Sequence, residues 1–197
     1  MYRFLETIKL KDGLFHRLPY HQQRINRCFA FYFQDCKAPD LTSFLLAEDF
    51  PKSGLYKCRV LYDAQGFMEP EFVLYQMKHI QTFKIIHTTL EPFCGKPADR
   101  SVFEELFALR EDADDVLLVR NGLLTDTSFA NIACFDGVSW VTPHRPIIYG
   151  TQRAYLLEEK MIIEKDIQLD KLHQYKKICL FNAMIEFGEL EIGICLK

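Results

Sequence analysis

The sequence predicts an α+β protein made of two domains. Segments that alternate between apolar and polar residues recur along all 197 residues, and this pattern is typical of strands. Amphipathic stretches with helical periodicity separate them. Residues 89–95 contain Pro92 and Gly95 and show little periodicity, which indicates a domain junction. We therefore expect a small N-terminal α+β domain over residues 1–90 and a larger C-terminal α+β domain over residues 91–197.

The first half of the chain begins with a predicted hairpin. Lys11-Asp12-Gly13 is a turn signal between two alternating segments. An amphipathic helix follows, with Ile25 and Phe29 on its apolar face. The expected strands are 4–10, 14–18, 54–62, 67–76 and 83–88, and the expected helices are 19–33 and 40–47.

The second half predicts a meander of strands between two helices. Asn121-Gly122 and Asp136-Gly137 favour type I′ hairpin turns, because both dipeptides tolerate positive φ. The expected helices are 100–110 and 151–160, and the expected strands are 116–119, 123–135, 138–141, 161–165, 177–182 and 190–195.

Composition excludes several classes of partner. The net charge is −3, and no run of like charges is long enough for a nucleic-acid or membrane arm. No stretch is apolar enough to span a membrane, and the N-terminus lacks a signal-peptide pattern, so we expect a cytoplasmic protein. The seven scattered cysteines form no metal-binding spacing, and no Walker or Rossmann loop is present. We expect no metal.

Two ionisable residues stand out by their position. Lys96 follows the predicted junction and precedes a helix, where a buried amine with a lowered pKa would be nucleophilic. Asp126 lies within a stretch of apolar and small residues, 124–133. The plain alternatives are that Lys96 is a solvated surface lysine and that Asp126 and Asn131 only stabilise a turn or bulge.

Lys96, Arg100 and the segment 125–131 together resemble the core of the class IV aminotransferases, which are fold-type IV enzymes that use pyridoxal 5′-phosphate (PLP). The resemblance implies a two-domain fold like that of D-amino acid aminotransferase, with a shortened N-terminal domain. It also implies that Lys96 holds PLP as a Schiff base and that Asp126 faces the pyridine nitrogen. The family more often has glutamate there, so the shorter aspartate requires a closer ring or a bridging water.

The same resemblance implies a set of phosphate ligands. Arg24 matches the arginine of the family's N-terminal signature, and a guanidinium suits phosphate because it donates two parallel hydrogen bonds. Gly150-Thr151-Gln152-Arg153 resembles the family's phosphate loop at a helix N-terminus, with Gln152 in place of the usual threonine. Asn182 and Ala183 match the place where the family contributes one more small polar group to the phosphate. As bare residues, Arg24 would be a solvated helix charge and Thr151 an ordinary cap.

Within the family, residues 55–66, Lys96 with Arg100, and 181–183 are similar to segments of aminodeoxychorismate lyases. This implies conversion of 4-amino-4-deoxychorismate to 4-aminobenzoate and pyruvate, a step of folate biosynthesis. A class IV aminotransferase acting on D-amino or branched-chain amino acids is the alternative. Arg59 or Arg100 could bind a substrate carboxylate in either case. A second alternative is an inactive binding protein, and the resemblance also implies a homodimer.

Overall fold

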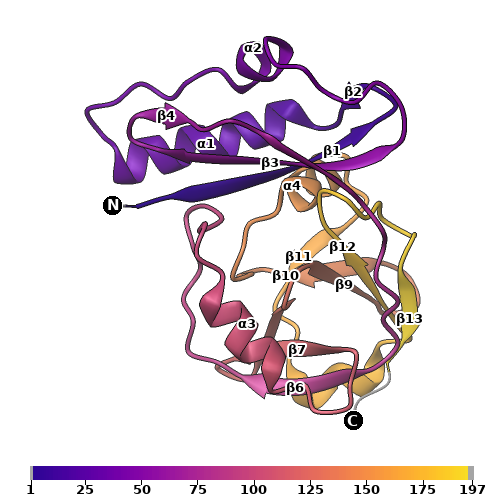
Figure 1. Ribbon diagram of the computed structural model, residues 1–197. Helices are drawn as coiled ribbons and strands as arrows, with labels where there is room; N and C mark the ends of the chain where they lie inside the picture. Colours follow the sequence, from indigo (N-terminus) through magenta and orange to yellow (C-terminus); the bar gives the residue numbers. More distant parts are fainter. Residues whose placement is uncertain (1, 195–197) are drawn as a thin grey trace. The chain divides into compact units, whose positions relative to one another are not determined.

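The computed structural model describes residues 2–194 (Figure 1). The chain divides into two compact units. The first holds the residues up to Met77 together with Phe93–Asp99, and the second holds Lys78–Pro92 together with the residues from Arg100 onward. This division differs from a single boundary at residue 90. The segment 78–90 groups with the second unit, and the segment that carries Lys96 groups with the first.

The first unit is an antiparallel sheet with one long helix. The strand order is β2-β1-β3-β4, and β5 also pairs with β3. The helix α1 lies along the sheet (Figure 1). The core between them includes Ile8, Ile25, Phe29 and Tyr62. Its strands are β1 (Phe4–Lys11), β2 (Leu14–Phe15), β3 (Leu55–Asp63), β4 (Gly66–Phe67) and β5 (Glu71–Leu74), and its helices are α1 (Leu18–Tyr32) and α2 (Leu41–Leu46).

The segment Phe93–Asp99 lies along the edge of β1. The Leu5 amide donates to the Lys96 carbonyl at 2.9 Å, and the Ala98 amide donates to the Arg3 carbonyl at 3.0 Å. Gly95 permits this approach, because a Cβ at that position would lie 2.1 Å from the Cys28 sulfur on α1. The backbone of Lys96 is therefore fixed within the first unit by β1 on one side and by α1 on the other.

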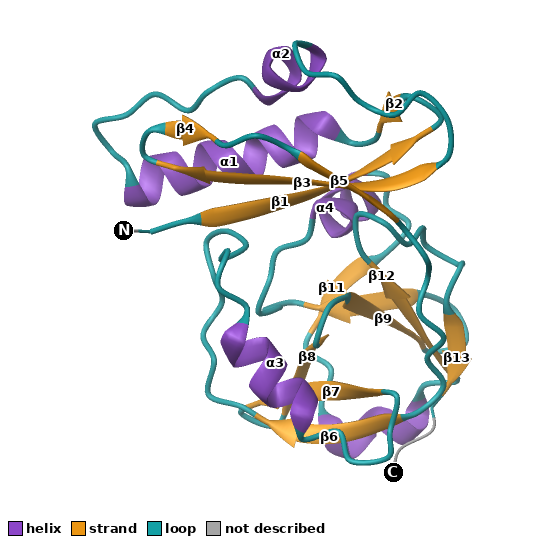
Figure 2. Cartoon of the chain, viewed as in Figure 1, coloured by secondary structure: helices purple, strands orange, loops and turns teal. Residues whose placement is uncertain are grey.

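The second unit is an eight-stranded mixed sheet. Its order is β11-β10-β9-β8-β7-β6, and β12 pairs with both β9 and β13. The β6–β7 and β10–β11 pairs are parallel. Figure 2 distinguishes its strands from its helices. The strands are β6 (Phe83–His87), β7 (Asp115–Arg120), β8 (Leu123–Thr127), β9 (Asn131–Phe135), β10 (Trp140–Pro143), β11 (Ile163–Lys165), β12 (Lys177–Phe181) and β13 (Glu191–Gly193), and the helices are α3 (Ser101–Ala108), α4 (Thr151–Glu158) and the 3-10 helix η1 (Leu169–Gln174).

Several local expectations differ from the structure. The expected strand 123–135 is two strands, β8 and β9, because a turn at 127–130 interrupts it. The expected strand 67–76 is likewise divided into β4 and β5 around Pro70, which cannot donate to a ladder. Asn121 and Gly122 both have positive φ, as a type I′ turn requires, whereas Asp136 does not. Its carboxylate instead accepts from the amides of residues 138 and 139.

Over residues 2–194, no helix combines the length and apolar character needed to cross a membrane. Within the same range, no group of three or more His, Cys, Asp or Glu side chains is placed to hold a metal ion. The six cysteines of the described residues are free thiols, of which four are buried, Cys94 is half-buried and Cys36 is exposed. Cys195 lies outside the described residues.

Candidate active site

Asp126 is a buried carboxylate held by three donors. It lies on β8 and is 3% exposed. Its Oδ1 accepts from Nδ2 of Asn131 at 2.7 Å, and its Oδ2 accepts from the amides of Ile147 and Ile148 at 2.6 and 2.9 Å. Burial raises the pKa of Asp126 to about 6, although these hydrogen bonds act in the opposite direction. The carboxyl group is therefore fixed in position and titrates near neutral pH.

The helix α4 begins beside this carboxylate network. Gly150 is its N-cap, with φ −70° and ψ 149°, and no side-chain hydrogen bond caps this end. A Cβ on Gly150 would lie 2.1 Å from Oδ1 of Asn131, so a side chain does not fit there. Thr151 and Gln152 are buried in the first turn. Their position at an uncapped helix N-terminus, where amides point outward, favours a bound anion.

The side chains of Gln152 and Asn182 differ in their hydrogen bonds. Nε2 of Gln152 donates to Glu186 at 3.2 Å, while its buried Oε1 has no hydrogen-bond partner among the described residues. Oδ1 of Asn182 accepts from the amides of Met184 and Ile185 at 2.8 and 3.1 Å, and its Nδ2 donates to the Phe129 carbonyl at 3.2 Å. The Asn182 side chain thus stabilises its own turn.

Ala183 lies at this same turn and is half-buried. Its methyl side chain has no polar atom, so any contact with a phosphate would use its backbone amide. The Asn182 side chain is occupied by its bonds to Met184, Ile185 and Phe129, and its backbone amide donates to the Ile185 carbonyl at 3.3 Å. Both residues remain predicted cofactor ligands.

Lys96 presents its amine to β1. Its Nζ donates to Oγ1 of Thr7 at 2.7 Å, and the lysine is half-buried. Thr7 was not singled out by sequence reasoning, because a threonine in an alternating strand carries no distinguishing signal. The structure shows that it fixes the direction of the predicted cofactor-binding amine.

Arg24 lies in a buried charge cluster with Glu6 and His21. The Nε and Nη2 atoms of Arg24 donate to the two oxygens of Glu6 at 2.9 and 2.5 Å, and Nδ1 of His21 lies 2.5 Å from Glu6. Arg24 is 4% exposed, so it is not the solvated helix charge of the plain alternative. It remains a predicted phosphate ligand, and Glu6 balances its charge within the first unit.

Burial alone would raise the pKa of Glu6, but Arg24 and His21 more than offset this and lower the pKa to about 2. Burial also lowers the pKa of His21 below its usual 6.5. The cluster at pH 7 is therefore an ionised Glu6, a charged Arg24 and a neutral His21. The sequence contains a signal for this charge cluster. His21 and Arg24 are three residues apart, on one helix face, and Glu6 is a charged residue that interrupts an apolar strand.

The two arginines predicted to bind a substrate carboxylate differ in their surroundings. Arg59 on β3 forms an exposed ion pair with Glu71 at 2.8 Å. Arg100, at the N-cap of α3, donates to the Ser128 carbonyl at 3.2 Å, and its guanidinium lies 3.7 Å from the ring centroid of Phe103. Arg100 is thus fixed beside the turn between β8 and β9, which also contacts Asn182.

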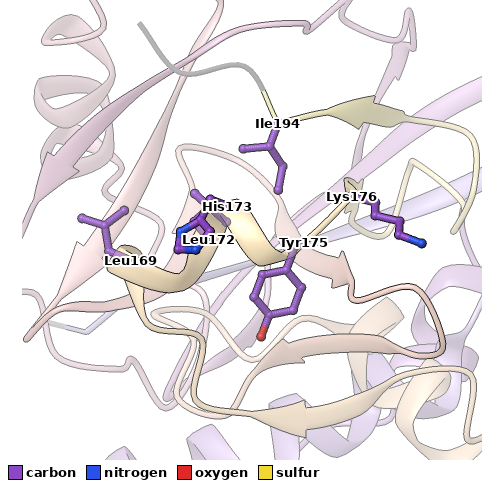
Figure 3. A pocket seen from close by; sticks show the side chains of 6 residues that line it. All are labelled: Leu169, Leu172, His173, Tyr175, Lys176 and Ile194. Atoms are coloured by element: carbon purple, nitrogen blue, oxygen red, sulfur yellow. The ribbon is translucent and has the colours of Figure 1, made fainter.

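A separate pocket contains none of these residues. It has a volume of about 460 Å³ and is formed by η1, the segment after it and the residue after β13. Figure 3 shows its lining side chains, which are Leu169, Leu172, His173, Tyr175, Lys176 and Ile194. The predicted site residues of the second unit gather instead at the β8–β9 turn and the start of α4.

Comparisons with known proteins are consistent with this geometry. A family model described as amino-transferase class IV matches residues 99–189. The chain is 31% identical over 186 residues to an uncharacterized protein of Haemophilus influenzae, covering 93% of this chain and 98% of that one. It is 26% identical over 191 residues to a protein of Schizosaccharomyces pombe named putative aminodeoxychorismate lyase, covering 88% and 83% respectively.

A crystal structure described as a putative 4-amino-4-deoxychorismate lyase from Haemophilus somnus superimposes with a TM-score of 0.85 at 31% identity. The match covers 94% of this chain and 98% of that one. The protein is therefore a member of the class IV aminotransferase family and has its fold-type IV α+β fold.

Proposed function

We propose that this protein is a PLP-dependent lyase that converts 4-amino-4-deoxychorismate to 4-aminobenzoate and pyruvate. The family typically uses PLP. The observation that carries the proposal is Asp126, a fully buried carboxyl group whose pKa is about 6 and which three neutral donors hold in place. A carboxylate kept in an apolar interior without an ion pair is costly unless a cationic ligand repays that cost.

The donor set of the chain fits PLP. Asp126 would hold the ring nitrogen, since among the described residues Oδ1 accepts one bond, from Asn131, and a carboxylate oxygen can accept a second. The backbone amides of Thr151 and Gln152 would bind the phosphate at the uncapped end of α4. Lys96 would bind the aldehyde through Nζ, and Arg24 would donate to the phosphate while sharing its charge with Glu6.

When bound, PLP supplies an electron sink for the carbanion that forms beside the substrate nitrogen. Asp126 keeps the ring nitrogen protonated, which makes that sink effective. Lys96 would act as the base that removes the proton from the substrate carbon that bears the nitrogen. The hydrogen bond from Nζ of Lys96 to Oγ1 of Thr7 would orient the amine for this step. Because Lys96 takes this proton while the enolpyruvyl ether leaves from the adjacent carbon, the products are 4-aminobenzoate and, after proton uptake, pyruvate.

The choice of a lyase rests on relatives. Proteins named as putative aminodeoxychorismate lyases match this chain over more than four-fifths of its length, one of them at 31% identity. Within the chain, Arg100 offers a fixed cation beside the β8–β9 turn for a carboxylate of the substrate. Arg59 is the weaker candidate, because its charge is already paired with Glu71.

The test supplies 4-amino-4-deoxychorismate to PLP-loaded protein and measures 4-aminobenzoate and pyruvate. We expect equal amounts of both, no product with Lys96→Ala, and normal activity with Lys11→Ala, an exposed lysine in the same unit. Exchange of D-amino or branched-chain amino acids with 2-oxoglutarate, without lyase products, would identify an aminotransferase instead. Absence of both activities would favour an inactive binding protein.

A further inference from the structure

We propose that Asn131 is a positioning residue that ties the Asp126 carboxylate to the backbone leading into α4. One amide side chain would then set the place of the group that holds the ring nitrogen and the place of the amides that bind the phosphate. This inference rests on the proposed PLP function. It assigns Asn131, the first residue of β9, a role that reaches beyond the β8–β9 turn before it.

The contacts of Asn131 extend from the Asp126 carboxylate to the start of α4. The side chain is buried, and its Nδ2 donates to Oδ1 of Asp126 at 2.7 Å and to the Ile148 carbonyl at 2.8 Å. Both N–H groups of the amide are therefore used. Its Oδ1 fills the space that a Cβ of Gly150 would need, at 2.1 Å from that position. One side chain thus contacts the carboxylate and two points of the segment 148–150.

A closed loop of hydrogen bonds results. Asp126 accepts from the amide of Ile148, and Asn131 donates both to Asp126 and to the carbonyl of the same Ile148. Moving the carboxylate therefore moves the backbone that leads to Thr151, the first residue of α4. Through this coupling, the Asn131 side chain would set the distance between the Asp126 carboxylate and the amides at the start of α4.

The alternative is that Asn131 only stabilises the β8–β9 turn. That turn already has its own bonds, because Thr127 donates its amide to the Ala130 carbonyl at 3.0 Å and accepts the Ala130 amide through Oγ1 at 3.1 Å. The Asn131 side-chain bonds instead join other residues, Asp126 and Ile148. Thr127 therefore provides a matched control: it serves the turn, whereas Asn131 serves the site.

The two roles differ in their effect on titration. The Asn131 bond lowers the pKa of Asp126 against the larger effect of burial, together with the amides of residues 147 and 148 and the charge of Arg153 on α4. Arg153 is itself paired with Glu164 on β11. Removing the Asn131 amide should raise the pKa of Asp126 further, whereas removing the Thr127 hydroxyl should leave it in place.

The experiment compares Asn131→Ala and Thr127→Ala with the unaltered protein in two measurements. The first is a carbon-13 NMR titration of the Asp126 carboxyl group without PLP. The second is the PLP dissociation constant by equilibrium dialysis between pH 5.5 and 8.5, chosen to span the Asp126 pKa of about 6. We expect Asn131→Ala alone to raise the carboxyl pKa, to weaken PLP binding about 10- to 100-fold, and to move the pH midpoint of binding upward.

The outcomes separate the inference from the proposed function. Equal effects of the two substitutions on PLP binding, with an unmoved Asp126 titration in Asn131→Ala, would overturn the positioning role. Failure of the unaltered protein to bind PLP would overturn the proposed function, and the titration would still decide whether Asn131 controls Asp126. Asn131→Asp provides a second variant of equal size, in which a like charge beside Asp126 should raise its pKa still more.

Discussion

Two buried carboxyl groups, Glu6 and Asp126, show how partners decide the charge of a residue. Both are fully buried, and burial alone would raise the pKa of each. Glu6 contacts Arg24 and His21, so its pKa falls to about 2. Asp126 contacts neutral donors, which lower its pKa by less than burial raises it, so its pKa is about 6. Glu6 is thus suited to be a permanently charged structural residue. Asp126 is suited to be a carboxyl group that gains its counter-charge from a cationic ligand.

Replacing Glu6 should therefore destabilise the protein strongly. Glu6→Gln leaves a buried Arg24 without its counter-charge, at a cost of about 3–5 kcal/mol in the free energy of unfolding. The matched control is Glu71→Gln, which removes the partner of Arg59 in an exposed pair and should cost about 0–1 kcal/mol. Urea unfolding at pH 7 measures both, and equal losses would contradict this account of the cluster.

The pH dependence of stability should report Asp126. Its folded pKa lies above its unfolded value of 3.8, so the folded state binds the proton more tightly, and stability falls as pH rises from about 4 through about 6. The loss is roughly 3 kcal/mol. Subtracting the unfolding curve of Asp126→Asn removes the other titrating groups. The difference should decline over this range in protein without PLP, and a constant difference would show that Asp126 titrates normally.

At the scale of elements, the segment Phe93–Asp99 shows why a lysine position needs a glycine before it. The segment pairs with β1 through two backbone hydrogen bonds and contacts α1 at Cys28. The close approach occurs at Gly95, where a Cβ would also lie 3.1 Å from the Phe4 ring. The geometry of Lys96 is thus set by an edge contact that only a residue without a side chain permits.

Gly95→Ala should destabilise the first unit by about 1–3 kcal/mol, because the new methyl group must displace a buried sulfur. Adding Cys28→Ala removes that sulfur, so the double variant should lose less than the sum of the two single variants. Gly193→Ala is the control, since no atom in the described part of the chain lies within 4 Å of its Cβ position. Strict additivity of the two substitutions would rule out the predicted contact.

Elements with a strong local pattern could be predicted from the sequence. The apolar face of α1, the turn at Gly13 and the Asn121-Gly122 hairpin follow from periodicity and positive φ, and the structure confirms them. The break between β8 and β9 could not be predicted, because residues 127–130 carry neither glycine nor proline, and the turn depends on the Thr127 hydroxyl. The 3-10 helix η1 was not predicted either, because its residues also include neither glycine nor proline.

The site residues were predicted from motifs that resemble those of a family, rather than from hydrophobic periodicity. Lys96 and Asp126 were found because their order along the chain resembles a family. Glu6, Thr7 and Asn131 act through other residues, and their partners are distant in sequence or depend on burial. Such supporting contacts require the packed structure, because a single strand residue does not indicate what lies across from it.

At the scale of the whole molecule, the aromatic end of α1 supports the proposed homodimer. Phe29 and Phe33 are buried, whereas Phe31 is 65% exposed and Tyr2 is 64% exposed, and both rings contact Tyr32. An exposed aromatic group of this kind is typical of protein interfaces. Light scattering after gel filtration should give twice the chain mass of 23.2 kDa. Phe31→Glu should lower this mass toward that of one chain, and an unaltered protein of 23.2 kDa would contradict the homodimer.

The central claim is that Lys96 is the amine that binds PLP, and covalent trapping tests it most directly. PLP-loaded protein is reduced with borohydride, which makes the bond between lysine and cofactor permanent, and the peptides are mapped by mass spectrometry. The account predicts one dominant adduct, on Lys96, and its loss in Lys96→Ala. Adducts spread over exposed lysines, with Lys96 unmodified, would contradict it.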